Sequence, residues 1–310
     1  MLYIAIGFLK SIQEYIDSEA KRGIVFLDDM LAYPSHSKIK KVARRFLIGR
    51  IPLPNRVVTL LLNGKRNEKS WLKEIHPGDV FLVGDVYNPK IFKAFSSVLP
   101  RGVKKNVYFT NPIDKDFKHP WQALNTFRKT GAYLWSFAPR DAEKYNLRMA
   151  GQFFFLPIGE NIGVGEKNSR QAFFCGLAKD RAEEIAQIKS FLQSHGIQCD
   201  FHIPIDSDRH LDFKQEYLPR LGQAGIVIDI NQKGQTGLTR RPIEALLWNK
   251  KLVTNNKTIV DYDFYRPENV FIFGMDDPCR FEHFIETPLA EVPENIKSRY
   301  TVEGWLKQFS

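Results

Sequence analysis

The stretch of the chain with the richest chemistry covers residues 224–256 and joins glycines to hydroxyl and cationic side chains. It reads AGIVIDINQKGQTGLTRRPIEALLWNKKLVTNN, which predicts a buried strand, a loop with Gly234 and Gly237, a helix and a second strand. Such a loop offers backbone N–H groups and the positive end of a helix dipole to a phosphate. We therefore expect an anion site in this loop. The side chains expected there are Gln235, Thr236, Thr239 and Arg240.

Glu244 lies about two turns into the expected helix, where its carboxylate could accept hydrogen bonds from a ribose. The same residues could instead have structural roles that involve no ligand. Thr236 or Thr239 would cap the helix, and Glu244 would be a solvated acid on its surface. The spacing leaves both interpretations open.

The same stretch resembles the donor-binding region of two-domain glycosyltransferases with the GT-B fold, in particular those of bacterial capsule and lipopolysaccharide gene clusters. Residues 172–192 are similar to the opening strand of their C-terminal domain, and residues 134–147 to a stretch near the end of their first domain. The resemblance covers residues 75–275. In the donor-binding region it rests on Gly237, Glu244, Ala245, Leu246, Lys250 or Lys251, Leu252, Thr254 and Asn256.

This resemblance implies an enzyme that transfers a sugar from a nucleotide-diphosphate sugar to a glycan or a lipid-linked acceptor during cell-surface polysaccharide synthesis. Gly176, Lys179 and Arg181 would approach the donor diphosphate, and residues 235–239, with Gly237 among them, would hold phosphate and sugar. Glu244 would bind the nucleotide ribose. The nucleotide sugar is then a substrate, and no cofactor is implied.

One position departs from the pattern of the family. Many retaining relatives carry two glutamates eight residues apart, whereas the position eight before Glu244 is Thr236. The resemblance therefore leaves open whether transfer inverts or retains the configuration of the sugar.

An inverting transfer needs a general base on the acceptor hydroxyl, and we expect it at the carboxyl end of a strand in the first half. Asp29 ends the expected strand 23–29, Asp85 ends the expected strand 79–85, and His36 lies in the loop after Asp29. Each has a structural alternative, as a helix cap, a turn residue or a solvated loop residue. The sequence does not choose among them.

Paired aspartates could also hold a divalent metal against the donor phosphates. Residues 206–208 have the required Asp-x-Asp spacing, but the same pattern recurs at 114–116 and 261–263. Relatives with the GT-B fold generally use helix dipoles and basic side chains instead. We therefore expect no metal.

A basic stretch without acidic residues runs from residue 30 to residue 67. If residues 38–48 are helical, apolar positions form a stripe flanked by cations, and this helix could lie on an anionic membrane and receive a lipid-linked acceptor. It could equally pack its stripe on the sheet of its own domain. The cations expected at the membrane or acceptor are Lys38, Lys41, Arg44 and Arg45.

The overall charge of the 310-residue chain is +10, and it is unevenly distributed. Residues 1–155 hold 26 Lys and Arg against 13 Asp and Glu, so the second half is slightly acidic. A basic nucleic-acid-binding protein is the alternative that this charge suggests, although no recognised binding motif accompanies it. An NAD enzyme would carry a G-x-G-x-x-G fingerprint, which is missing after every expected strand. A non-catalytic α/β protein remains open as well.

The location expected for the protein is the cytoplasm, with peripheral contact to the inner face of the membrane. No apolar run approaches the about 20 residues of a membrane span, and the first residues lack the features of a signal peptide. The cysteines, Cys175, Cys199 and Cys279, are odd in number and far apart, which favours reduced thiols.

The elements that must position these residues are parallel strands alternating with helices. We expect an α/β fold of two Rossmann-like domains with a cleft between them, the GT-B architecture. The domains would be residues 1–157 for the acceptor and 158–310 for the donor, with a C-terminal helix at about 300–309 packing back on the first. The expected strands are 23–29, 56–62, 79–85, 105–111, 132–137, 172–176, 196–203, 224–230, 251–256 and 269–274.

Overall fold

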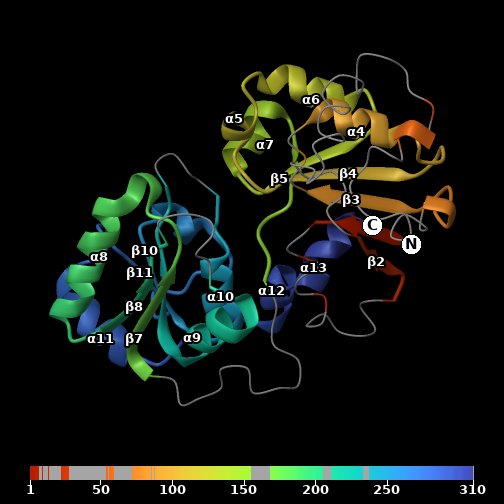
Figure 1. Cartoon of the computed structure of the whole chain (residues 1–310). Helices are drawn as coiled ribbons and strands as arrows, with labels where there is room; N and C mark the ends of the chain where they lie inside the picture. The colour runs from red at the N-terminus through yellow and green to blue at the C-terminus, as the bar shows by residue number, and fades with distance from the viewer. Residues whose placement is uncertain are drawn as a thin grey trace. The chain divides into compact units, whose positions relative to one another are not determined.

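The structure is a computed structural model that divides into two compact units (Figure 1). The first unit comprises Met1–Gly151 and Leu306–Ser310, and the second comprises Gln152–Trp305. The boundary expected between residues 157 and 158 lies outside the described residues. Those described are 1–6, 9, 13, 22–27, 54, 56–58, 72–84, 86, 88–154, 168–204, 211–232 and 237–309.

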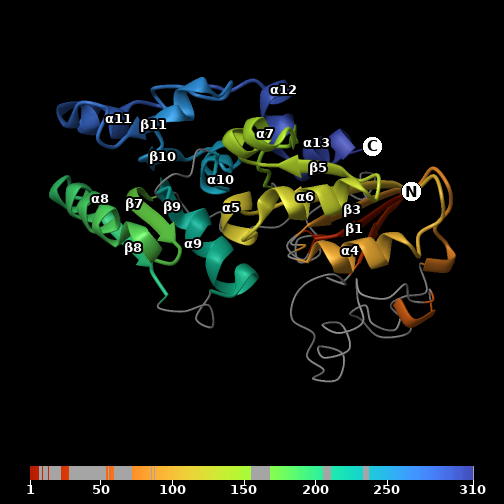
Figure 2. The same cartoon turned by 90° about the horizontal axis from the view of Figure 1, so that it is seen from above.

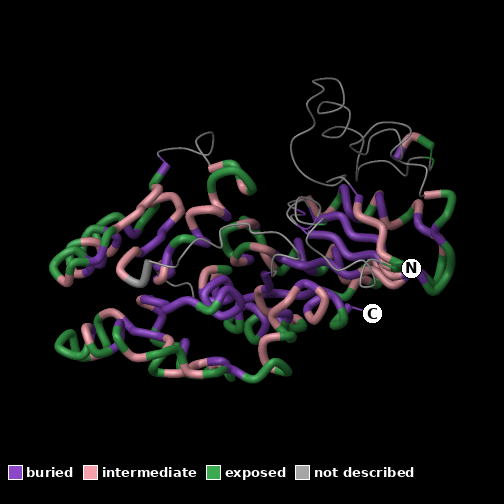
Figure 3. The backbone as a smooth tube through the Cα atoms, turned by 90° about the horizontal axis from the view of Figure 1, so that it is seen from below, coloured by how far each residue is buried: buried purple, intermediate pink, exposed green. Residues whose placement is uncertain are grey.

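The first unit contains a six-stranded parallel sheet with the order β2-β1-β3-β4-β5-β6. Its central strands are largely buried, as the tube in Figure 3 shows. The strands are β1 (Leu2–Ala5), β2 (Ile24–Phe26), β3 (Val80–Gly84), β4 (Lys104–Phe109), β5 (Tyr133–Ser136) and β6 (Arg148–Met149).

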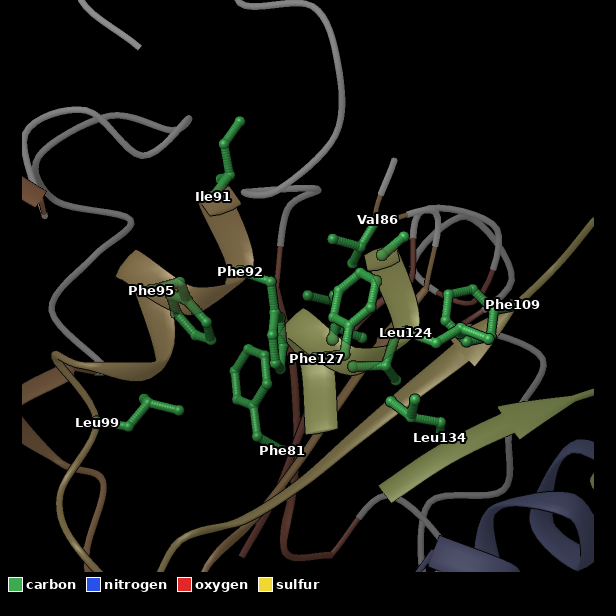
Figure 4. Close-up of a cluster of buried hydrophobic side chains, with 14 of the residues drawn as sticks. Phe81, Val86, Ile91, Phe92, Phe95, Leu99, Phe109, Leu124, Phe127 and Leu134 are labelled. Atoms are coloured by element: carbon green, nitrogen blue, oxygen red, sulfur yellow. The ribbon is translucent and has the colours of Figure 1, made fainter. Parts of the chain in front are cut away.

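Helices α4 (Pro89–Ser96) and α6 (Pro120–Arg128) lie side by side over one face of this sheet (Figure 1). The Asn88 side chain caps α4 by accepting hydrogen bonds from the backbone N–H groups of residues 90 and 91. Aromatic rings from the helices and strands fill the interface, and Phe127 contacts the rings of Phe92 and Phe109 (Figure 4). Two shorter helices, α5 (Ile113–Asp116) and α7 (Pro139–Tyr145), belong to the same unit.

The opposite face of this sheet receives the last residues of the chain. Helix α13 (Val302–Leu306) leads into the 3-10 turn η9 (Lys307–Phe309), and the Phe309 ring lies 4.8 Å from that of Trp135 and 6.4 Å from that of Tyr108. Asn106 accepts a hydrogen bond from the Trp135 indole at 2.9 Å. Phe309 is completely buried, so the C-terminal segment is part of the core of the first unit.

The second unit contains a five-stranded parallel sheet with the order β11-β10-β9-β7-β8. Helices α8 and α11 cover one face, and α9 and α10 cover the other (Figures 1 and 2). The strands are β7 (Asn168–Cys175), β8 (Gln198–His202), β9 (Ala224–Asp229), β10 (Lys251–Thr254) and β11 (Val270–Ile272). The helices are α8 (Ala182–Ser194), α9 (Leu218–Gln223), α10 (Arg241–Leu247) and α11 (Phe281–Glu286). The short α12 (Glu294–Lys297) follows α11.

Both sheets follow the same doubly wound order, in which the chain starts near the middle, moves to one edge, and returns to build the other side. The order reverses between β1 and β3 in the first unit and between β7 and β9 in the second. At a reversal the loops after the two strands diverge to opposite faces of the sheet, which leaves room for a ligand at their carboxyl ends.

These two parallel sheets confirm the expected α/β class with two Rossmann-like folds, and all five strands expected in the second half are present. The strand expected at 56–62 is wrong, because residues 56–58 are helical. The carbonyl of Pro54 accepts hydrogen bonds from the N–H groups of Val57 and Val58, and these local bonds override the β-branched pattern. Strand β1 was not predicted, because its short apolar run at residues 2–5 lacks flanking turn signals.

Replacing Phe309 by Ala should lower the free energy of unfolding of the first unit by about 3–5 kcal/mol, because it empties a fully buried site beside Trp135. Urea unfolding followed by tryptophan fluorescence measures the loss. Lys307→Ala, in the same turn but exposed, should change the stability little. Equal stabilities of the two variants would show that the C-terminal segment is not part of this core.

Candidate functional site

The candidate site lies where strands β7 and β9 of the second unit end side by side. These strands are neighbours in the sheet, and the strand order reverses between them. Strand β7 ends at Cys175 and is followed by Gly176, while β9 ends at Asp229 and is followed by Ile230. This is the place at which open α/β sheets bind ligands.

Arg181 brings a buried guanidinium group to this point. It follows the loop after β7 and forms the end of the 3-10 turn η3 (Lys179–Arg181) that precedes α8. Its Nε and Nη2 donate hydrogen bonds to the Leu177 carbonyl at 3.2 and 3.0 Å, and its Nη1 donates to the Ile230 carbonyl. The side chain therefore ties the loop after β7 to the end of β9.

Arg241 brings a second guanidinium group from the start of α10. Its Nη2 donates a hydrogen bond to the Cys175 carbonyl, and its Nε is buried without a hydrogen-bond partner. Both guanidinium groups lie over the ring of Phe174, with the central carbon of Arg241 at 5.0 Å from the ring centre and that of Arg181 at 5.5 Å. One aromatic ring thus supports both cations.

Gly176 is where the two guanidinium groups converge. A Cβ atom at this position would lie 2.7 Å from Nη2 of Arg241 and 2.9 Å from Nη2 of Arg181. Real Cβ atoms do not approach polar nitrogens so closely, so a side chain here would displace both heads. The absence of a side chain at residue 176 lets two cations share one short piece of backbone.

The two guanidinium groups create a concentration of positive charge. Among the residues that the structure describes, neither forms an ion pair with a carboxylate. Burial, and then the proximity of Arg241, lowers the pKa of Arg181 to about 10, so Arg181 remains protonated at neutral pH. Arg181 is buried and Arg241 is half-buried. The buried carboxylates of Asp229 and Glu244 act on them electrostatically without forming ion pairs. Two neighbouring guanidinium groups that are not ion-paired favour an anionic ligand and suit phosphate oxygens in particular.

Asp229 holds the loop before α10 against the ends of two strands. Its fully buried carboxylate accepts hydrogen bonds from the hydroxyls of Thr239, at 2.7 Å, and Thr254, at 2.9 Å. The Thr239 hydroxyl also accepts a bond from the Arg241 N–H at 3.2 Å. Thr239 thus contributes to the start of the helix, as the structural interpretation of this residue expects, and it fixes the backbone that carries Arg241.

Asparagine side chains line the carboxyl ends of β9 and β10 beside this cluster. Asn255 accepts a hydrogen bond from the N–H of Asn231 at 2.8 Å and donates one to its carbonyl at 3.3 Å. The side chain of Asn231 and the Nδ2 of Asn256 are buried and have no hydrogen-bond partner among the protein atoms. This edge of the sheet therefore offers uncharged donors and an acceptor next to the cations.

Glu244 is buried rather than solvated, which makes the surface-acid interpretation of this residue wrong. Its Oε2 accepts a hydrogen bond from the Tyr217 hydroxyl at 2.7 Å, and the Tyr217 ring packs on Phe173 and Phe213. Burial raises the pKa of the Glu244 carboxyl and that of the Tyr217 hydroxyl. A ribose contact by Glu244 stays a prediction.

The other expected donor residues lie around the same edge where the structure describes them. Lys179 is exposed and has a positive φ of 47°, which is uncommon for a residue with a side chain. Gly237 is buried, and Arg240 is exposed at the N-cap of α10. Gln235 and Thr236 lie outside the described residues.

The side chains expected to act on the acceptor lie outside the described residues. This applies to the candidate bases and to the cations of the basic stretch, which stay predictions: Asp29, His36, Asp85, Lys38, Lys41, Arg44 and Arg45. In the described part of the chain, no group of three or more His, Cys, Asp or Glu side chains is placed to bind a metal.

The sequence interpretation missed Arg241, Asp229 and Asn231. The pair Arg240-Arg241 signals a cation at the start of the helix, but only the fold shows that Arg241 reaches the Cys175 carbonyl while Arg240 is exposed. Asp229 could have been found as a carboxylate that ends a buried strand beside the expected loop. Nothing in the sequence distinguishes Asn231 from other polar residues after a strand.

No helix in the described residues has the length and apolar character needed to span a membrane.

Comparison with known proteins adds little to this geometry. No family model matches the chain, and no curated protein matches it. Among solved structures, accessory secretory protein 1, 2 and 3 from Streptococcus pneumoniae aligns with 11% identity and a TM-score of 0.45, over 82% of this chain and 52% of that one. The chain thus spans about half the length of that structure. The glycosyltransferase SnogD from Streptomyces nogalater aligns with 12% identity and a TM-score of 0.41, over 93% and 95% of the two chains. At these values the likeness carries no inference about activity.

Replacing Gly176 by Ala should weaken the binding of inorganic pyrophosphate by about tenfold or more, because the new Cβ displaces both guanidinium heads. Isothermal titration calorimetry measures the affinity. Gly151→Ala is a matched control, since a Cβ there meets nothing within 4 Å and should leave binding unchanged. Unaltered pyrophosphate affinity in the Gly176 variant would contradict an anion site at this glycine.

Proposed function

We propose that the protein is a glycosyltransferase whose second unit holds a nucleotide-diphosphate sugar. The observation that carries this proposal is the pair Arg181 and Arg241, which meet at Gly176 beside the reversal of strand order. Neither guanidinium group forms an ion pair with a carboxylate of the described residues. A diphosphate supplies the charge and the acceptor oxygens that such a pair requires. The sequence resemblance supports a sugar nucleotide as the molecule that carries it.

The chemistry of transfer explains why cations belong at this point. The bond between the anomeric carbon and the phosphate oxygen breaks, and its electron pair leaves with the diphosphate. A bond forms between the acceptor oxygen and the anomeric carbon, and the acceptor proton passes to a base. Arg181 and Arg241 stabilise the negative charge that develops on the departing diphosphate, and the burial of Arg181 strengthens this effect.

Other residues complete the proposed donor site. Lys179 and Arg240 add exposed cations at its rim, and residues 235–239 hold phosphate and sugar, as the resemblance implies. Glu244 binds the ribose in this proposal. The general base is one of Asp29, Asp85 and His36, and the replacement of the first family glutamate by Thr236 leaves the stereochemical course open.

The proposed acceptor is a glycan or a lipid-linked glycan in capsule or lipopolysaccharide synthesis. The surplus of Lys and Arg in residues 1–155 supports an anionic surface or acceptor on that side of the reaction. Lys38, Lys41, Arg44 and Arg45 would place the protein peripherally on the cytoplasmic leaflet.

Nucleotide binding tests the proposal directly. Thermal unfolding with UDP, GDP, CMP and ADP should reveal at least one stabilising ligand, because a ligand at 100 times its Kd adds about 2.7 kcal/mol. Arg241→Gln should weaken that ligand by about 10- to 100-fold, since it removes a charged donor to phosphate.

The matched control for this substitution is Arg280→Gln, an exposed arginine of the same unit that should leave affinity unchanged. Stabilisation by none of the four nucleotides, or full affinity in the Arg241 variant, would refute the proposed donor site.

Metal removal gives an independent prediction. Because two guanidinium groups supply the positive charge that a divalent cation would bring to a diphosphate, EDTA should leave the transfer rate unchanged, and added magnesium should not increase it. The rate at which nucleoside diphosphate is released measures the effect of EDTA and that of magnesium. A loss of activity in EDTA that magnesium restores would overturn this part of the proposal.

A further inference from the structure

Asn231 is a buried side chain whose hydrogen-bonding groups are unused. Only 6% of the residue is exposed, and neither its Nδ2 nor its Oδ1 has a partner among the protein atoms. Its backbone, in contrast, is fixed by two hydrogen bonds to the Asn255 side chain. A buried amide without partners is costly and rare in folded proteins, so it needs an explanation.

The unpartnered groups of the second unit gather at one place. In the described part of this unit, every buried side-chain nitrogen or oxygen without a partner belongs to Asn231, Asn256 or Arg241. Asn231 and Asn256 follow the neighbouring strands β9 and β10, and Arg241 is half of the guanidinium pair. Chance placement of orphaned groups would not favour the edge at which this fold binds ligands.

The position of Asn231 relates it to the diphosphate. It directly follows Ile230, whose carbonyl accepts the hydrogen bond from Nη1 of Arg181. The Asn231 amide therefore belongs to the residue next to the one that Arg181 contacts. In a sugar nucleotide, the groups bonded directly to the two ends of the diphosphate are both sugar rings, whereas the base is farther away.

We propose that Asn231, assisted by Asn256, binds hydroxyl groups of a sugar ring attached to the diphosphate that Arg181 and Arg241 hold. An amide presents a donor and an acceptor together, which matches the paired donor and acceptor character of neighbouring hydroxyls. Asn256 offers a further donor, while its Oδ1 accepts bonds from Thr258. This inference rests on the proposed function and names the residues that distinguish a sugar nucleotide from a bare diphosphate.

The test uses Asn231→Leu, which has a similar volume and removes both polar atoms. Without ligand, the variant should unfold at the same or a higher temperature than the wild type, because the substitution removes no hydrogen bond. Its affinity for inorganic pyrophosphate should be unchanged. Its affinity for a sugar-containing ligand should fall by about three- to tenfold, which corresponds to one or two lost hydrogen bonds.

The control is Asn269→Leu, because both polar atoms of Asn269 have partners in the same unit. Its Nδ2 donates to the Ala290 carbonyl at 2.9 Å and its Oδ1 accepts from the Ala290 N–H at 2.8 Å. This variant should unfold at a lower temperature and bind all the ligands like the wild type. Asn231→Ala is the second variant at the test position, should the leucine not be accommodated.

Three ligands separate the outcomes: pyrophosphate, whichever nucleoside diphosphate of UDP, GDP and ADP stabilises the wild type best, and the glucose ester of that nucleoside diphosphate. If the variant loses affinity for both the nucleoside diphosphate and its glucose ester, Asn231 binds the ribose. If it loses affinity for the ester alone, Asn231 binds the transferred sugar. Unchanged affinity for both, or an equal loss with pyrophosphate, overturns this inference alone. Failure of the wild type to bind any of them overturns the donor site as well.

Discussion

Two guanidinium groups of like charge lie against one residue of backbone, and this constraint governs the second unit. Arg181 and Arg241 come from opposite sides of the reversal in strand order and meet at Gly176 only because that residue has no side chain. Backbone carbonyls of both strands, not carboxylates, hold them in place. Among the described residues, the nearby carboxylates of Asp229 and Glu244 act on the pair electrostatically without forming ion pairs with it.

In the second unit, apolar side chains stabilise the sheet, and polar side chains lie at the carboxyl ends of its strands. Ile226, Ile228 and Val253 pack with α8 and α11 and stabilise the sheet. At the carboxyl ends of the same strands, Asp229 uses both of its carboxylate oxygens to hold Thr239 and Thr254. Beyond it lie amides without partners, which cost stability in the free protein. A site that binds a ligand tolerates this cost, because binding supplies the missing hydrogen bonds.

Individual residues show which parts of the candidate site could be predicted from the sequence. The loop after β7, with Gly176 and Arg181, was expected at the donor because this part of the sequence resembles GT-B glycosyltransferases. The sequence could not show which of the adjacent arginines 240 and 241 enters the site, because their side chains point in different directions depending on where the helix begins. Glu244 was taken for either a ribose ligand or a surface acid, and its burial depends on Tyr217, a residue 27 positions earlier in the chain.

The sequence by itself determined the α/β class and the alternation of strands and helices in the second half, because each follows from local periodicity and composition. Only the tertiary structure decided that β7 and β9 lie side by side, that Arg241 is the partner of Arg181, and that the C-terminal Phe309 completes the core of the first unit. These are contacts between distant segments, and no local pattern encodes which partner a buried side chain will meet.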